Sequence, residues 1–162
     1  MNRIIPGIIL LLFFGACAEQ STLTDEERAK VTAEVRQMLT SYDDDVRENG
    51  LSAEFKYLDN SPDFFWVPPG YTSALAYDSV VTIIKKNAAL FTKVDNSWDT
   101  LTIYPLTNRL ASFTGKINSH ITEITGNTMQ FTLVETGMAI KREDGWKILN
   151  GQTAVLEEKQ VY

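Results

Sequence analysis

The spacing of apolar residues predicts a long helix at the start of the globular part of the chain. Its apolar positions recur at intervals of three and four residues, the spacing of one helix face. They are Val31, Val35, Met38, Leu39, Tyr42 and Val46. Thr24 followed by Glu27 has the pattern of a capping box, which predicts that the helix begins there. Asn49 and Gly50 form a typical helix stop.

Two shorter helices and one short strand are predicted next. Residues 51–58 can form a second helix, and residues 63–67 form a very apolar strand that ends at Pro68-Pro69-Gly70. A third helix is expected from Asp78 or Ser79 to Lys93. Its expected buried face consists of Val80, Val81, Ile84, Ala88 and Phe91.

From residue 98 onward the apolar pattern alternates with period two, as in half-buried strands. Strands are predicted over residues 98–106, 110–123, 128–141 and 146–156, with a hairpin turn at Asp144-Gly145. Trp146 is expected to be buried between the last strand and a helix. Helices first and an antiparallel meander afterwards describe an α+β domain whose helices cover one face of the sheet.

The order of these elements resembles the nuclear transport factor 2-like (SnoaL-like) superfamily over roughly residues 24–157. The last hairpin, residues 144–148, is similar to that of the superfamily, and Tyr42 resembles its first-helix tyrosine. The resemblance implies a cone-like, curved antiparallel sheet packed on three N-terminal helices, with a pocket inside. Members include isomerase-like enzymes, cyclases, dehydratases, epoxide hydrolases and proteins with no known reaction, so the fold does not determine the function.

The N-terminus has the pattern of a secretory signal. Arg3 precedes an apolar run over residues 4–14, which is too short for a membrane-spanning helix of about 20 residues. Residues 14–17, Phe-Gly-Ala-Cys, resemble a bacterial lipobox, in which Cys17 would be lipidated. The expected organisation is a signal peptide at 1–16, a lipidated Cys17 with a linker to residue 23, and one domain at 24–162. The alternative is cleavage after Ala18, which would give a soluble secreted or periplasmic protein.

The amino-acid composition argues against several classes of partner and site. The 162 residues carry 15 basic and 21 acidic side chains, a net charge of −6, which argues against nucleic acid as a partner. The single cysteine excludes an internal disulfide framework, and the single histidine excludes a multi-histidine metal centre. The sequence therefore predicts no metal and no cofactor, and it predicts contact with the membrane through the lipid anchor alone.

Glu135 is the candidate catalytic residue. It has the same strand parity as Phe131 and Leu133, so a regular strand points its carboxyl toward the apolar side. Burial there would raise its pKa and suit it to general acid or base work. The alternative is a bulge near Gly137 that turns Glu135 to solvent, which the opposite parity of Met138 favours.

Other residues are candidates for a ligand pocket. Asn150 and Gln152 share strand parity with Trp146 and could line it, unless the last strand instead buries Leu149, Thr153 and Val155. Aromatic walls could come from Tyr42, Tyr57, Trp66 and Trp98.

Three sequence features argue against particular kinds of catalytic or metal-binding site. His120 is expected to be exposed, and the run Asp43-Asp44-Asp45 is expected to form a solvated helix face, because consecutive helix positions fan out by about 100°. Val67 stands where isomerase-like members of the superfamily have an aspartate base before the proline, which disfavours that reaction.

Three functions remain open. The first is a lipid-anchored protein of the bacterial cell envelope whose pocket binds a small apolar or amphipathic molecule without catalysis. The second is a lyase, isomerase or hydrolase that uses Glu135. The third is an interaction module that forms a homodimer through the open sheet face. An inward, buried and hydrogen-bonded Glu135 would favour chemistry, whereas a contiguous apolar patch on the outer sheet face would favour the dimer.

Overall fold

A computed structural model of the chain describes residues 23–161, so the predicted signal peptide and Cys17 lie outside the described residues. The order of elements along the chain is α1 (Asp25–Asn49), the 3₁₀ helix η1 (Leu51–Lys56), β1 (Phe65–Val67), α2 (Tyr77–Ala88), β2 (Phe91–Thr107), β3 (Leu110–Glu123), β4 (Thr128–Arg142) and β5 (Gly145–Val161).

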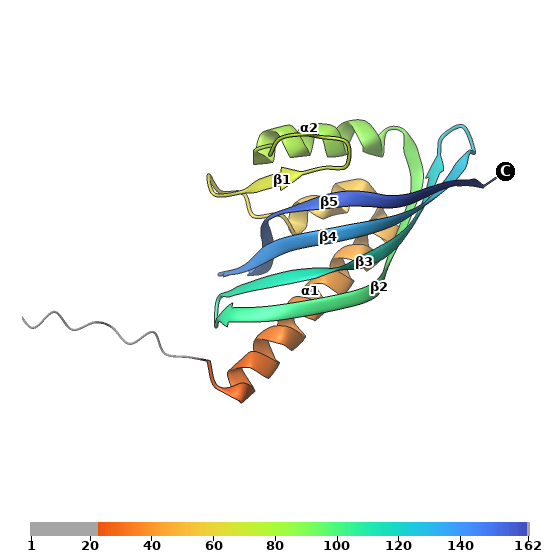
Figure 1. The fold of residues 1–162 in the computed structure, drawn as a ribbon. Helices are drawn as coiled ribbons and strands as arrows, with labels where there is room; N and C mark the ends of the chain where they lie inside the picture. The colour runs from red at the N-terminus through yellow and green to blue at the C-terminus, as the bar shows by residue number, and fades with distance from the viewer. Residues whose placement is uncertain (1–22, 162) are drawn as a thin grey trace, which may run out of the picture.

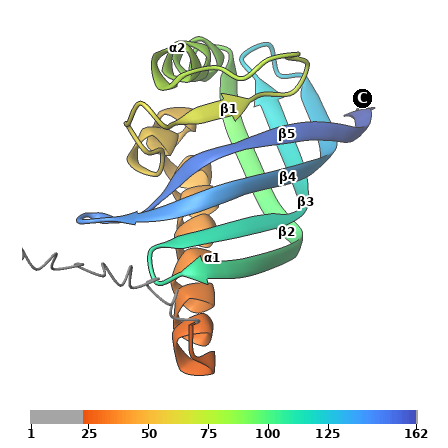
Figure 2. The same cartoon turned by 60° about the vertical axis from the view of Figure 1, so that its left-hand side comes forward.

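The strands form one sheet in the order β1-β5-β4-β3-β2. All neighbours are antiparallel except β1, which pairs in parallel with β5. The long strands curl, and α1 crosses the inside of the curl while α2 lies near β1 (Figures 1 and 2). This arrangement confirms the predicted α+β fold with helices on one face of a curved sheet.

Helix α1 begins and ends where the sequence predicts. The Thr24 hydroxyl accepts a hydrogen bond from the Glu27 backbone N–H at 3.2 Å, and the Glu27 carboxylate accepts one from the Thr24 N–H at 2.8 Å. The helix ends at Gly50, whose φ of 80° is a conformation that favours glycine. Its apolar stripe packs mainly against β2.

The boundary between α2 and β2 differs from the prediction. Helix α2 ends at Ala88 rather than Lys93, and β2 begins at Phe91 rather than Trp98. Strand pairing explains the difference, because Phe91 already pairs with Glu123 of β3. A register shift between Phe91 and Lys93 interrupts the alternation, which hides the start of the strand in the sequence.

Glycines on three neighbouring strands let aromatic rings lie directly on the backbone inside the curl. A Cβ atom on Gly137 would lie 2.8 Å from the Phe113 ring, and one on Gly151 would lie 2.6 Å from the Trp66 ring. A Cβ on Gly115 would lie 2.0 Å from the Thr100 carbonyl oxygen. These positions therefore cannot carry a side chain without displacing the strand or ring that covers them.

Trp146 is 7% exposed and lies between β5 and α1, as predicted. Its indole N–H donates a hydrogen bond of 2.8 Å to Glu34 of α1. The same carboxylate oxygen accepts a hydrogen bond of 2.7 Å from Lys141. This cluster joins the β4–β5 hairpin to the first helix.

We expect Trp146→Ala to lower the free energy of unfolding by roughly 3–5 kcal/mol, because it leaves a large cavity in the core. Chemical denaturation of the variant and the wild type measures the change. Tyr104→Ala is the matched control, since Tyr104 is 54% exposed on β2 and should change stability by less than about 0.5 kcal/mol. Equal stabilities for Trp146→Ala and the control would contradict this description of the core.

Candidate functional site

A cavity of about 220 Å³ lies between the helices and the inside of the curled sheet. Most of its wall is apolar and comes from every element between α1 and β5, with Trp66 of β1 and Leu133 of β4 among the larger side chains. The polar side chains on its wall are Tyr42, Glu54, Asn87, Asn96, Ser119, Glu135 and Thr153. An apolar enclosure with a few convergent polar groups is the usual form of a small-molecule site.

Glu135 points into this cavity and is 8% exposed. Strand β4 runs without interruption against β3, so the residue keeps the inward parity that it shares with Leu133. The Thr153 hydroxyl donates a hydrogen bond of 3.3 Å to its carboxylate. Burial first, and then the negative charges of Asp43 and Glu54, raise the pKa of Glu135 to about 8.

Asp43 corrects the expectation that the whole Asp43-Asp44-Asp45 run is a solvated face. Asp43 lies one helical turn beyond the buried Leu39 and is itself 5% exposed. Burial first, and then the charge of Asp44, raise the pKa of Asp43 to about 7. Asp44 and Asp45 do lie nearer the surface, where Asp44 pairs with Arg47 and Asp45 pairs with Lys56.

Glu54 is a second carboxyl in the cavity wall, and the sequence reading did not single it out. Burial raises the pKa of Glu54 to about 7, which a hydrogen bond with Tyr42 offsets in part. The Tyr42 hydroxyl has its pKa raised well above the ordinary value, first by burial and then by the charges of Glu54 and Glu135. The cavity wall thus carries carboxyls from η1 and β4, and the buried Asp43 of α1 lies close enough for its charge to raise the pKa of both.

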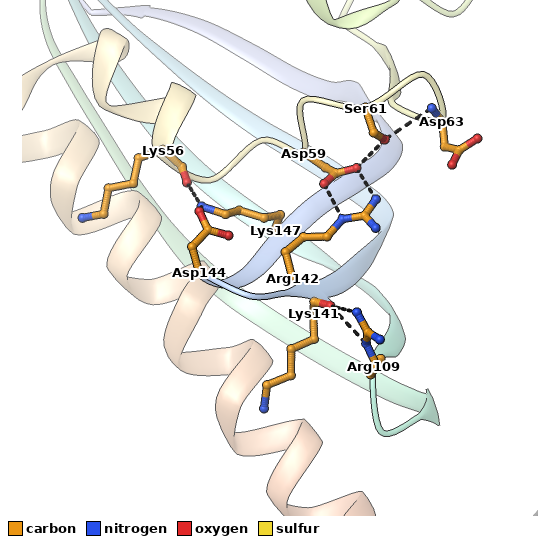
Figure 3. A network of polar contacts seen from close by, with 9 residues as sticks. All are labelled: Lys56, Asp59, Ser61, Asp63, Arg109, Lys141, Arg142, Asp144 and Lys147. Atoms are coloured by element: carbon orange, nitrogen blue, oxygen red, sulfur yellow. Dashed lines mark hydrogen bonds and ion pairs between the residues drawn. The ribbon is translucent and has the colours of Figure 1, made fainter.

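A network of polar contacts holds η1, which carries Glu54, against the sheet (Figure 3). Arg142 of β4 donates two hydrogen bonds of 2.7 Å to Asp59, which lies just after η1. Lys147 of β5 donates one of 2.6 Å to the carbonyl of Lys56. The Arg142 guanidinium holds the pKa of Asp59 below its usual value. This network includes the Arg142–Asp59 ion pair, whereas the described residues that line the cavity include no basic side chain.

The structure places Asn150 and Gln152 on the outer face of the sheet, away from the cavity. An extra residue in β5, Leu149, shifts the pairing with β4 between Ile148 and Asn150. That bulge reverses the inward parity, so Thr153 faces inward instead. The shared parity with Trp146 therefore does not hold beyond Ile148, which corrects the expected place of both residues.

The expected aromatic walls divide into two groups. Tyr42 and Trp66 line the cavity. Tyr57 lies beneath Tyr42, with ring centroids 5.5 Å apart, and its hydroxyl donates to the Ser41 carbonyl at 2.9 Å. Trp98 packs edge-on against Phe113 at 6.3 Å. These two support the wall and are not among the residues that line the cavity.

Asn96, Ser119 and Thr153 also line the cavity, although the sequence reading did not select them as site residues. Ser119 shares parity with the apolar Ile117 and Ile121, so its inward direction could have been read from the alternation. Asn96 shares parity with Val94 in a part of β2 that had not been predicted as strand. The inward direction of Asn96 can be predicted only when β2 is known to begin at Phe91.

The outer face of β3 and β4 is largely polar. His120 is exposed there, as expected, and pairs across the sheet with Gln130. Thr114 and Thr136 share a hydrogen bond of 2.7 Å on the same face. This surface does not favour an apolar dimer interface at the centre of the sheet.

Residues 23–161 contain neither a candidate metal site nor a helix that could span a membrane. No group of three or more histidine, cysteine, aspartate or glutamate side chains in this part of the chain could hold a metal ion. No helix in the same range has the length and apolar character needed to cross a membrane.

No family model and no curated protein matches the sequence. Solved structures do resemble the fold. A hexachlorocyclohexane dehydrochlorinase from Novosphingobium barchaimii has a TM-score of 0.68 at 9% identity, over 85% of this chain and 94% of that one. A candidate scytalone dehydratase from Novosphingobium aromaticivorans has a TM-score of 0.70 at 9% identity, over 80% and 87%.

A nuclear transport factor 2-like superfamily protein from Salmonella enterica has a TM-score of 0.67 at 14% identity, over 78% of this chain and 92% of that one. The chain therefore has the cone-like fold of nuclear transport factor 2-like proteins, as the order of its elements implied. Identities this low establish the fold alone, and proteins with this fold include enzymes as well as proteins with no reaction in their names.

We expect the stability of the wild type to fall as the pH rises from about 4.5 to about 8, because the unfolded chain ionises Glu135 first. Glu135→Gln keeps the shape and removes the charge. It should match the wild type at low pH and be more stable above pH 8 by roughly 3–5 kcal/mol, at about 1.4 kcal/mol per pKa unit.

Denaturant unfolding at a series of pH values tests this expectation. Glu143→Gln is the matched control, because Glu143 is exposed in the β4–β5 turn and its stability curve should follow the wild type. If the Glu135→Gln curve also follows the wild type at every pH, Glu135 is not a desolvated acid.

Proposed function

We propose that this domain binds a small, largely apolar molecule in its cavity, and that a lipid on Cys17 anchors it in the bacterial cell envelope. The observation that carries the binding proposal is the buried Glu135 carboxyl, which faces a cavity whose described lining residues include no basic side chain.

A buried carboxyl is an unfavourable way to fill a core. Leaving a buried ionisable group without a partner costs free energy that an apolar side chain of similar size would not. At this position β4 pairs with Gly115 on one side and Thr153 on the other, and the Glu135 carboxyl lies on the cavity wall with the Thr153 hydroxyl as its hydrogen-bond donor. Such an arrangement suits a polar atom of a bound molecule better than it suits stability.

Mass spectrometry of the purified domain under native conditions should detect a bound small molecule. Leu133→Trp, which fills the cavity, should lose this molecule. Val134→Trp is the control, since the neighbouring side chain on the same strand faces outward and should leave binding unchanged. If the wild type carries no ligand and no compound from a panel of small apolar molecules raises its melting temperature, the binding proposal is wrong.

The anchor is an independent part of the proposal and rests on the sequence alone. Cys17→Ser should abolish acyl labelling and move the protein from the membrane fraction to the soluble fraction, because several acyl chains on one residue anchor a protein stably. Metabolic labelling and fractionation measure both effects. A wild type that carries no acyl label, with Cys17→Ser still in the membrane fraction, would contradict it.

A lyase, isomerase or hydrolase reaction is the second candidate, and it is favoured because Glu135 points inward, is buried and is hydrogen-bonded to Thr153. Glu135 has a pKa of about 8 and lies near the Tyr42 hydroxyl, so it can give or take a proton near neutral pH. Two of the similar structures are named as a dehydrochlorinase and a dehydratase, which are enzymes. If the molecule found by mass spectrometry is converted by the wild type and only bound by Glu135→Gln, this second function is the correct one.

A further inference from the structure

We infer that the cavity is built for an organic cation, a molecule that carries a protonated amine on a compact apolar body. This inference rests on the proposed binding function and specifies the class of ligand for the same cavity. It depends on the charges around the cavity, on unpaired acceptor atoms and on the nature of the wall.

The acidic groups face the cavity region from separate elements, and no base among the described lining residues balances them. Glu135 lies on β4 and Glu54 on η1, and both feel the charge of Asp43 on α1. Tyr42, from α1, is the other titratable group on the wall. The nearby Lys56 is paired with Asp45 at 2.6 Å. Arg47 is paired with Asp44 and only weakly offsets the pKa of Asp43.

Buried acceptor atoms in the same region have no hydrogen-bond donor. Oδ1 of Asp43, in a side chain 5% exposed, is unpaired, and so is Oδ1 of Asn96 in the cavity wall. The indole N–H of Trp98 also lacks a partner of good hydrogen-bond geometry, but it interacts with Asp43 and lowers the pKa of that carboxyl. Because buried polar atoms in folded proteins normally have partners, the Asn96 oxygen on the cavity wall indicates a place for an N–H donor supplied by a ligand.

The residues that line the cavity favour an organic cation over a metal ion. No group of acidic, cysteine or histidine side chains among residues 23–161 could hold a metal ion. Tyr42, Trp66 and Phe91 place aromatic rings on the wall, and aromatic faces attract ammonium groups. An ammonium beside Glu135 would form a charge-assisted hydrogen bond, which is about twice as strong as a neutral one.

Binding of a cation should be coupled to loss of a proton. With a pKa of about 8, Glu135 is largely protonated at neutral pH, and a bound ammonium favours its ionised form. Affinity for the cation should therefore rise as the pH increases from about 6 to about 9, a range in which an alkylammonium remains charged. The affinity for a neutral molecule of the same shape should not rise with pH in this way.

Calorimetry on the purified full-length chain can test the inference with cyclohexylammonium, with the neutral cyclohexanol, and with calcium chloride. At about pH 9, cyclohexylammonium should bind at least about tenfold more tightly than cyclohexanol, because one charge-assisted hydrogen bond contributes roughly this much. Glu135→Gln should remove the difference between the two compounds, whereas Glu143→Gln, in the exposed β4–β5 turn, should leave the binding of both unchanged.

Four results would overturn the inference. They are equal or tighter binding of cyclohexanol, an unchanged preference in Glu135→Gln, saturable binding of calcium in place of the ammonium, and no binding of cyclohexylammonium at millimolar concentration. None of these results tests the proposed binding function itself. That function is tested by the molecule detected in native mass spectrometry and by its loss in Leu133→Trp.

Discussion

Close contact between aromatic rings and bare backbone shapes the inside of this domain. Phe113 and Trp66 lie on Gly137 and Gly151, where any side chain would collide with the rings. Gly115, on the next strand, lies under Thr100 and the Trp98 ring. These neighbouring positions allow the strands to curl tightly around α1 and η1, and the cavity is the space left inside that curl. Glu135 of β4 pairs with Gly115 of β3, next to these aromatic rings.

Electrostatics then give the cavity its chemical character. The ion pair between Arg142 and Asp59 fastens the segment after η1 to the sheet, outside the cavity wall. Glu54 and Glu135 on the wall have no base among the described lining residues. Burial raises the pKa of Asp43, Glu54 and Glu135. The charge of Asp43 raises the pKa of both glutamates further, and the charge of Glu54 adds to the shift of Glu135. The result is an apolar space whose polar groups are mainly acceptors, ready to be satisfied by a ligand with positive charge or with hydrogen-bond donors.

Much of the fold could be read from the sequence, because helical spacing, the capping box and strand alternation are local signals. Strand β3 begins and ends where alternation predicts, and the parity of Leu133 places Glu135 correctly. The failures have specific physical causes. A single extra residue at Leu149 reverses the parity for Asn150 and Gln152, and a register shift near Phe91 hides the start of β2. Glu54 and Asp43 could not be assigned to the cavity region from local pattern, because only the docking of η1 and α1 on the sheet brings them together.

The central claim is that Glu135 is a desolvated carboxyl without a compensating base, and its own titration tests this most directly. The carbon chemical shift of the Glu135 carboxyl, followed by nuclear magnetic resonance across a pH series, reports its protonation without altering the protein. The account predicts a midpoint near pH 8, far above the ordinary value of 4.5. A midpoint at or below 4.5 would show that the carboxyl is hydrated or paired with a base, and would contradict the account.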